Sequence, residues 1–469
     1  MTFKRWLPIV LLLVAFAMRT AWLADVPPGL HHDEVIYTSI AEKALGGGWS
    51  IFYPEGQGRE GFYIPFLAAA LKWLGTGAFA LRVPSVFLSV LSLCVVYALT
   101  RRLFGSSVAL FAMAEMSFTF WTVFPGRVAM RAVTEPLIAA LAACTLWLAI
   151  RNSEARGQRS DSTIPYLGFV IAGLLIGLTV YTYRGARALP AILVALPVYL
   201  ALFDRATLKR IWRGLLICAV VAVIVAMPLV VLLTAHPELD QLDWAGRDQV
   251  LKALSAGDVR PMLGTTVATL GAFFFRGDPD DYYNLGGRPV FSLVTGALFV
   301  VGVLLALKRT LRGQLQYAYL LMWFALALAP GMVSEPAPHF YRIIGAQMAA
   351  FAFPGIALER LKFQTPALPT GGLWLRAGAS VSSLKSQMEY AFFEGKYWAF
   401  DISRVSPRGR NVERARLFCR VEQQGDRARL VEHAYCASRQ LSGSQRGADT
   451  GCCLHAAGEP ARAVAADRT

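Results

Sequence analysis

Long apolar runs are the feature that most limits how this chain can fold. Runs of about 16 to 22 residues recur along roughly the first 360 positions, and a helix of that length crosses the ~30 Å hydrocarbon core of a bilayer. Backbone inside lipid must satisfy its own hydrogen bonds, which leaves helices or closed barrels. Barrel strands would alternate over short segments. The sequence therefore predicts an all-α polytopic membrane protein.

Composition supports this class and argues against nucleic-acid binding. Of the 469 residues, 55% are hydrophobic and only 16% are charged, against about 25% charged in soluble domains. The net charge of +15 would suit nucleic acid, but the chain has no basic stripe interleaved with stacking aromatics. The arginines lie mostly in short loops between the apolar runs. No nucleic-acid partner is predicted, and the bilayer is the expected surroundings.

The positive-inside rule orients the predicted helices. Lys4 and Arg5 precede the first run, which shows no cleavage site and is interpreted as an uncleaved span with a cytoplasmic N-terminus. The short basic loops fall on that same side, and the long loops 24–80 and 234–288 fall on the other. The predicted crossings are about 6–23, 81–100, 107–124, 133–150, 165–182, 188–203, 214–233, 290–307, 316–333 and 343–361.

The first long loop carries a dense polar cluster that begins at His31 and ends at Glu60. The apolar stretch 62–74 in this loop contains Pro65 and Lys72 and suits a helix lying in the interface. Asp33 and Glu34 have two interpretations. They cap the start of a helix, or Asp33 is a general base in a partly dry cleft, where burial raises the pKa of a carboxylate. Glu60, in the same loop, strengthens the second interpretation.

Arginines on the external side break the positive-inside trend and indicate an anion site. Several guanidinium groups at the membrane edge suit a phosphate, which they bind bidentately. Arg131 has a competing interpretation, an ion pair with Glu135 four residues later. Adjacent histidines seldom bind one ion together, so no metal or other cofactor is predicted, although a divalent ion stays open. The candidate binding residues are His32, Glu34, Arg59, Arg127, Arg131, Tyr183, Arg184, Arg187, His339 and Arg342, with Asp33 and Glu60 as catalytic candidates.

An ordered series of short motifs resembles glycosyltransferase family 39, which has the C-type membrane fold. That family includes the protein O-mannosyltransferases and the aminoarabinose transferase of lipid A. The resemblance covers about residues 5–360 and is to a bacterial branch. The carrying residues are Asp33-Glu34 with Tyr37 and Ala41, Gly58-Arg59-Glu60, Ala80 to Ser85, Arg101 to Gly105, Gly126-Arg127 with Arg131, Tyr181 to Arg184, Phe274 to Pro279, Asn284-Leu285, Gly287 to Pro289, and His339-Phe340 with Arg342.

The resemblance implies a fold, a donor and a set of roles. The fold is a C-type bundle of about ten or more transmembrane helices, with interfacial helices in the first external loop. The donor is a polyprenyl-phosphate monosaccharide, and the sugar is transferred with inversion to a hydroxyl or amine of a lipid, glycan or protein. Asp33 falls on the catalytic aspartate, Glu60 near a second acidic residue, and Arg59 near residues that meet the donor phosphate.

The chain divides into three parts by composition. Residues 1–361 are predicted to form the transmembrane domain, which the resemblance implies is that of an enzyme in the cytoplasmic membrane with its site on the external face. Residues 362–402 read as a remnant or the start of further family segments, and 403–469 as a disordered or aberrant tail. The alternative function is a transporter or flippase of lipid-linked sugars. It would share the arginines, but inverted repeats are expected there and none is visible.

Overall fold

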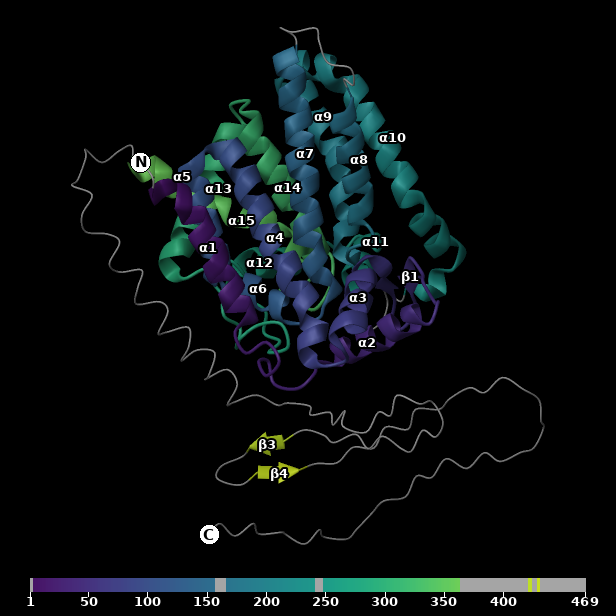
Figure 1. Ribbon diagram of the computed structural model, residues 1–469. Coiled ribbons are helices and arrows are strands. Elements are labelled where there is room, and N and C mark those ends of the chain that lie inside the picture. Colours follow the sequence, from purple (N-terminus) through teal and green to yellow (C-terminus); the bar gives the residue numbers. More distant parts are fainter. Residues whose placement is uncertain (1–2, 157–165, 241–247, 363–420, 424–427, 431–469) are drawn as a thin grey trace.

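The structure is a computed structural model that describes residues 3–156, 166–240, 248–362, 421–423 and 428–430. Within these ranges the chain forms a bundle of long helices (Figure 1). Its main helices are α1 (Phe3–Thr20), α4 (Ala78–Phe104), α5 (Ser106–Phe118), α6 (Phe120–Val123), α7 (Thr134–Arg156), α8 (Leu167–Thr179), α9 (Ile192–Phe203), α10 (Arg205–Ala235), α13 (Leu293–Thr310), α14 (Leu315–Met332), α15 (Gln347–Ala350) and α16 (Ala352–Lys362).

Short helices, strands and 3-10 turns lie between these main helices. They are α2 (His32–Leu45), β1 (Phe52–Tyr53), β2 (Arg59–Glu60), α3 (Ile64–Leu74), α11 (Gln249–Ser255), α12 (Arg260–Gly271), β3 (Val421–Gln423), β4 (Ala428–Leu430) and the 3-10 turns η1 (Gly61–Tyr63), η2 (Pro125–Arg127), η3 (Arg131–Val133), η4 (Arg184–Ala191), η5 (Pro237–Leu239) and η7 (Ile344–Ala346).

The membrane-spanning character of the bundle is confirmed, whereas the number of crossings stays a prediction. Among the described residues, six helices are long and apolar enough to cross a bilayer, or seven if the bent pair α5 and α6 is one span. Three shorter apolar helices, α1, α3 and α8, add to them. All ten segments predicted to cross contain helix. The tail predictions for 363–402 and for most of 403–469 lie outside the described residues. In the described part of the tail, β3 pairs antiparallel with β4.

The first long loop forms a small layer at one end of the bundle, where α2, α3 and β1 lie together (Figure 1). The predicted interfacial helix is present as α3, which packs against α2 and α4. Its outer face exposes Phe66 and Trp73, the latter 78% accessible, as suits a helix seated at a membrane interface. β1 and β2 pair antiparallel, with Tyr53 opposite Arg59. This hairpin returns the chain towards the start of α2.

A buried arginine holds the break between α5 and α6. The two helices meet at a bend of 76°, which leaves carbonyls at the end of α5 without helical partners. Arg19 is fully buried and donates to the carbonyls of Met116 at 3.2 Å and Thr122 at 3.2 Å, and to Ser89 Oγ at 2.8 Å. The charge that interrupts the first apolar run therefore satisfies the backbone of a neighbouring broken helix.

Two glycines bring α8 into close contact with α10. A Cβ on Gly173 would lie 2.5 Å from the carbonyl oxygen of Cys218, and one on Gly177 would lie 2.6 Å from that of Ala222. Their four-residue spacing is the small-residue pattern of closely packed membrane helices. We expect Gly177→Val to lower the thermal unfolding midpoint of the detergent-solubilised protein, with a cost of about 1–3 kcal/mol or more from overpacking.

The matched control for this variant is Gly264→Ala on α12, where an added Cβ meets no atom within 4 Å. It should melt as the wild type does. Equal melting of both variants would show that the α8–α10 contact is looser than its geometry indicates.

Candidate active site

Asp33 is the second residue of α2, and the helix cap comes from its neighbour. His31 is the N-cap residue, and its ring nitrogen accepts from the backbone N–H of Asp33 at 3.4 Å. Glu34 completes a capping box by accepting from the backbone N–H of His31 at 2.9 Å. The interpretation of Asp33 as the cap is therefore wrong. The cap leaves the carboxylate of Asp33 available for another contact.

The carboxylate of Asp33 binds the guanidinium of Arg59 from β2. The nitrogen–oxygen distance is 2.5 Å, and Arg59 also donates to the hydroxyl of Tyr37 at 3.0 Å. Burial would raise the pKa of Asp33, but the charge and hydrogen bond of Arg59, together with His31 and Arg131, outweigh it and hold the pKa below its usual value. The expectation of a raised pKa for Asp33 is thus wrong in this structure, because Arg59 is paired with the carboxylate as its counter-ion.

Glu60 is buried between two arginines. Arg131 from η3 and Arg187 from η4 each lie 2.7 Å from one of its oxygens. Burial would raise the pKa of Glu60, but these two charges hold it below its usual value. Arg131 also donates to the hydroxyl of Tyr37 at 2.6 Å, so Tyr37 joins the Asp33 and Glu60 pairs. The predicted Arg131–Glu135 pair is not formed, since Arg131 binds Glu60 instead.

Asp240 extends the same arrangement and was missed in the sequence. It follows η5, and its two oxygens bind Arg184 and Arg187. Arg184 also donates to the carbonyl of Gln57 at 3.1 Å, which ties this group to the β1–β2 hairpin. No pattern marks Asp240, because single acidic residues in long loops are common. The one signal that points to Asp240 is its position in the loop 234–288, which was predicted to lie on the external side.

These residues form two groups of ion pairs that the hydroxyl of Tyr37 joins, together called the ion-pair chain. It holds four arginines and three carboxylates, a net charge of +1 (4 − 3). Segments far apart in the sequence supply it, and guanidinium groups gathered in this way suit a phosphate, which they can bind bidentately. Its members are Asp33, Arg59, Arg131, Glu60, Arg187, Asp240 and Arg184.

Glu34 has a structural place rather than a binding one. It is fully buried and pairs with Arg82 of α4 at 3.0 Å. It also accepts from the backbone N–H of Ala129 at 2.9 Å. Its oxygens are therefore engaged by protein groups on three sides, which corrects the prediction that Glu34 binds substrate.

Arg127 is likewise a structural arginine. It is buried and donates to the carbonyls of Met18 at 2.8 Å, Ala21 at 2.7 Å and Val26 at 2.9 Å. These carbonyls lie at the end of α1 and just beyond it, where backbone acceptors lack helical partners. The prediction that Arg127 binds a phosphate is corrected accordingly.

The remaining predicted residues border the ion-pair chain or lie in a neighbouring loop. The ring of Tyr183 lies under the guanidinium of Arg131, 5.1 Å from its centre, and His32 is exposed at the start of α2. Arg342 donates to Ser334 Oγ at 3.0 Å, and the ring of His339 lies 4.5 Å from that of Tyr283. These contacts place Tyr183 in the site and the last two in the loop beside it.

An aromatic series connects that loop to the start of α2. The ring of Tyr282 contacts that of His31, and Tyr283 lies next to Tyr282 with ring centres 4.9 Å apart. Asp278, which lies in the quoted motif Phe274 to Pro279 but was not chosen as a site residue, accepts from the backbone N–H of Phe340 at 2.7 Å. Burial raises the pKa of Asp278 to about 6. The 274–291 segment is therefore anchored close to Asp33.

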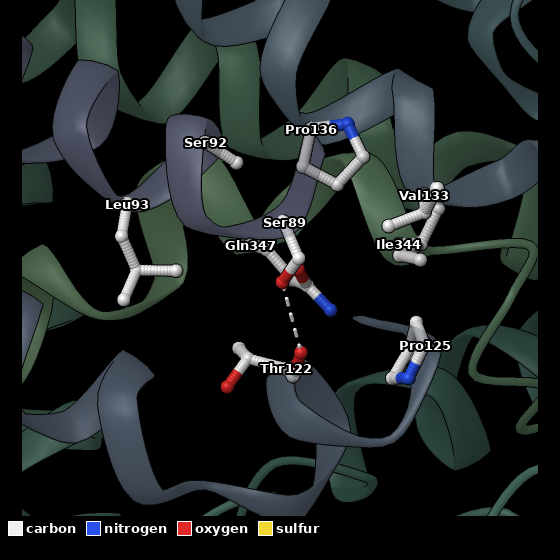
Figure 2. A pocket seen from close by; sticks show the side chains of 9 residues that line it. All are labelled: Ser89, Ser92, Leu93, Thr122, Pro125, Val133, Pro136, Ile344 and Gln347. Atoms are coloured by element: carbon white, nitrogen blue, oxygen red, sulfur yellow. Dashed lines mark hydrogen bonds between the residues drawn. The ribbon is translucent and has the colours of Figure 1, made fainter. Parts of the chain in front are cut away.

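The cavities and possible metal ligands do not add to this site. Figure 2 shows Ser89 facing Thr122 across a cavity of about 10 Å³, room for about one water molecule. A larger cavity of about 510 Å³, which Phe104, Arg309 and Tyr317 help to line, contains no member of the ion-pair chain. Within the described ranges, no group of three or more His, Cys, Asp or Glu side chains could hold a metal.

The bundle of long apolar helices, with an interfacial layer and a charged site at one end, has the C-type membrane glycosyltransferase fold of its structural neighbours. The oligosaccharyltransferase of Archaeoglobus fulgidus has this fold at a TM-score of 0.51 and 16% identity, over 83% of this chain and 54% of that one. ArnT from Cupriavidus metallidurans, bound to undecaprenyl phosphate, gives a TM-score of 0.48 at 17% identity, over 76% of this chain and 59% of that one.

Residues 61–231 match the family model described as dolichyl-phosphate-mannose-protein mannosyltransferase. The undecaprenyl phosphate-alpha-4-amino-4-deoxy-L-arabinose arabinosyl transferase of Edwardsiella ictaluri (strain 93-146) is 28% identical over 217 residues, 44% of this chain and 36% of that protein. The family model and this relative agree with the resemblance to glycosyltransferase family 39 that the motifs give. The matched part of the chain covers about a third, 36%, of the length of this curated relative.

Proposed function

We propose that the protein is an inverting glycosyltransferase that moves a monosaccharide from a polyprenyl-phosphate donor to a hydroxyl or amine acceptor. The acceptor is carried by a lipid, a glycan or a protein. The observation that carries this proposal is the ion-pair chain, which brings the predicted base Asp33 and four arginines into one place. The relatives described above act on or bind polyprenyl phosphates, and this supports the same class of donor.

The arginines act on the phosphate of the donor. As the glycosidic bond to phosphate breaks, charge builds on the leaving oxygen, and guanidinium groups already held in place stabilise it. In the structure these groups are paired with carboxylates. A phosphate therefore enters by taking over arginine contacts, and the net +1 charge of the ion-pair chain (4 − 3) favours its entry.

Asp33 acts as the general base once Arg59 turns to the phosphate. Without that counter-ion, burial dominates and the pKa of Asp33 rises towards a range useful for proton transfer. Asp33 then takes the proton of the acceptor hydroxyl, whose oxygen forms the new bond to the anomeric carbon. The bond from that carbon to the phosphate oxygen breaks, and the polyprenyl phosphate leaves with the electron pair.

We assign the site to the external face of the cytoplasmic membrane on the distribution of charge. α7 begins beside the α2–α3 layer and ends at the opposite end of the bundle (Figure 1). Basic residues close helices at that opposite end, among them Arg101 and Arg102 on α4. By the positive-inside rule this end is cytoplasmic, so the ion-pair chain faces outward. The N-terminus is then cytoplasmic as well.

Loss of Arg187 should weaken binding of undecaprenyl phosphate. Arg187→Gln leaves Glu60 paired with Arg131 and Asp240 paired with Arg184, so the fold should be kept. One charge-assisted hydrogen bond is worth ~1.5–3 kcal/mol, and we expect a Kd about 10- to 100-fold higher, read from thermal stabilisation by the added lipid.

The control is Arg205→Gln, at the basic end of the bundle, where the guanidinium bonds only to the carbonyl of Ala201 among the described residues. Its Kd should equal that of the wild type. If both variants bind undecaprenyl phosphate equally well, the ion-pair chain is not the phosphate site.

A further inference from the structure

Asp240 occupies the most accessible end of the ion-pair chain. Its carboxylate oxygens bind one guanidinium each, Oδ1 that of Arg184 and Oδ2 that of Arg187. The side chains of these two arginines are 19% and 27% exposed, against 10% for Arg59 and 8% for Arg131. A charged ligand that reaches the ion-pair chain from outside therefore meets Arg184 and Arg187 first, and both are bound to Asp240.

These two arginines have hydrogen-bond donors that Asp240 leaves unused. The Nε atoms of Arg184 and Arg187 are both buried, and neither has a hydrogen-bond partner among the described residues. Buried donors without partners are costly. Arg187 also pairs with Glu60 at 2.7 Å, and Arg184 donates to the carbonyl of Gln57 at 3.1 Å. Both guanidinium groups thus keep a contact without Asp240 and have donors to spare for another anion.

A carboxylate and the phosphate of a sugar donor present the same charge to such a pair of arginines. The phosphodiester that joins a polyprenol to a sugar carries one negative charge on two non-bridging oxygens, and a carboxylate carries one on its two oxygens. Arginine binds both groups through its fork of N–H donors. Exchange of the Asp240 carboxylate for this phosphate therefore leaves the charge bound by the arginines unchanged. The two further oxygens of the phosphate can accept from the unused donors.

We propose that Arg184 and Arg187 form the subsite for the donor phosphate, and that Asp240 stands in for the phosphate there until the donor binds. The inference rests on the proposed function, which it deepens by naming the arginines that the phosphate meets. On binding, the Asp240 carboxylate turns to solvent and the phosphate takes its place. As the glycosidic bond breaks, the leaving phosphate gains a second negative charge beside the two guanidinium groups. Asp240 returns when this product leaves.

The exchange predicts that loss of the acidic side chain improves binding. When a site is open in only a fraction of the molecules, the apparent Kd is raised by that fraction. We expect Asp240→Asn to lower the Kd for undecaprenyl phosphate about tenfold, read from thermal stabilisation of the detergent-solubilised protein. This change is opposite in direction to that of Arg187→Gln. Undecaprenol, which has the same chain without the phosphate, should stabilise the wild type and Asp240→Asn equally.

Glu238→Gln is the matched control for the lost charge. Glu238 is an exposed carboxylate two residues before Asp240, and among the described residues its side chain pairs only with His236, at 3.1 Å. The substitution removes the same charge from the same loop without touching the arginines. Its Kd for undecaprenyl phosphate should equal that of the wild type.

A charge-balanced variant covers the case in which Asp240→Asn does not fold. Arg184→Gln with Asp240→Asn removes one charge of each sign, and it should bind undecaprenyl phosphate more tightly than Arg184→Gln alone. Equal or weaker binding after loss of Asp240, or an equal gain with undecaprenol, would overturn the stand-in. The proposed function would still hold if Arg187→Gln weakens binding. If neither Arg187→Gln nor Asp240→Asn changes the Kd, both proposals fail.

Discussion

Asp33→Asn should abolish sugar transfer while leaving the protein folded. Asparagine keeps the shape of the side chain and an oxygen for Arg59, which lies 2.5 Å from Asp33, but it cannot take a proton from the acceptor. General base catalysis contributes about 10²–10⁴-fold to a rate. We expect a loss of at least that size in liposomes that contain the purified protein, a polyprenyl-phosphate sugar and an acceptor extract.

The appropriate control is Asp25→Asn, an exposed carboxylate in the same loop, which should transfer at the wild-type rate. Both variants should melt close to the wild type, because α2 is capped by His31 and Glu34 and not by Asp33. Retained turnover in Asp33→Asn would remove Asp33 from the role of base, whatever its effect on binding.

Arg82→Met should cause the largest loss of stability. Arg82 is fully buried, pairs with Glu34 at 3.0 Å, and donates to the carbonyls of Leu23 at 3.1 Å and Pro27 at 2.8 Å. Methionine fills part of the space but leaves the carboxylate of Glu34 buried without its counter-ion. Breaking a buried pair in this way costs ~3–5 kcal/mol. Thermal unfolding and the yield of folded protein measure it.

Arg102→Met, on the same helix, controls for loss of a positive charge, because Arg102 is exposed and bonds only to the carbonyl of Ala98 within the described part of the chain. It should melt as the wild type does. Arg82→Met should also lose transfer, because Glu34 fixes the start of α2 and so the position of Asp33. Wild-type melting of Arg82→Met would show that this buried pair does not anchor the first loop.

The sequence predicted the bundle well, because the bilayer imposes one strong rule. A crossing helix needs about 20 apolar residues, and all ten segments chosen on that basis contain helix. The breaks within them were not predictable. The bend between α5 and α6 depends on Arg19, which lies about 100 residues away in the chain and reads locally as an interruption of another helix.

The site was predicted in part, and the misses have a common cause. Residue type and side of the membrane brought Asp33, Arg59 and Glu60 into one hypothesis, and the structure places them together. Arg127 has the same charge and the same predicted side, yet it binds backbone carbonyls. Sequence shows where a charge lies along the chain, but its partners come from segments that only tertiary packing brings near, as with Asp240.

Mass spectrometry of lipid-linked sugars and envelope glycans tests the central claim most directly. Cells without the gene are compared with cells that carry the wild type or Asp33→Asn. Transfer from a polyprenyl-phosphate donor predicts that one glycan decreases in the deletion strain while its carrier-linked sugar accumulates. Wild type should restore both, and Asp33→Asn neither. Unchanged levels of every carrier-linked sugar and every envelope glycan in the deletion strain would contradict the account.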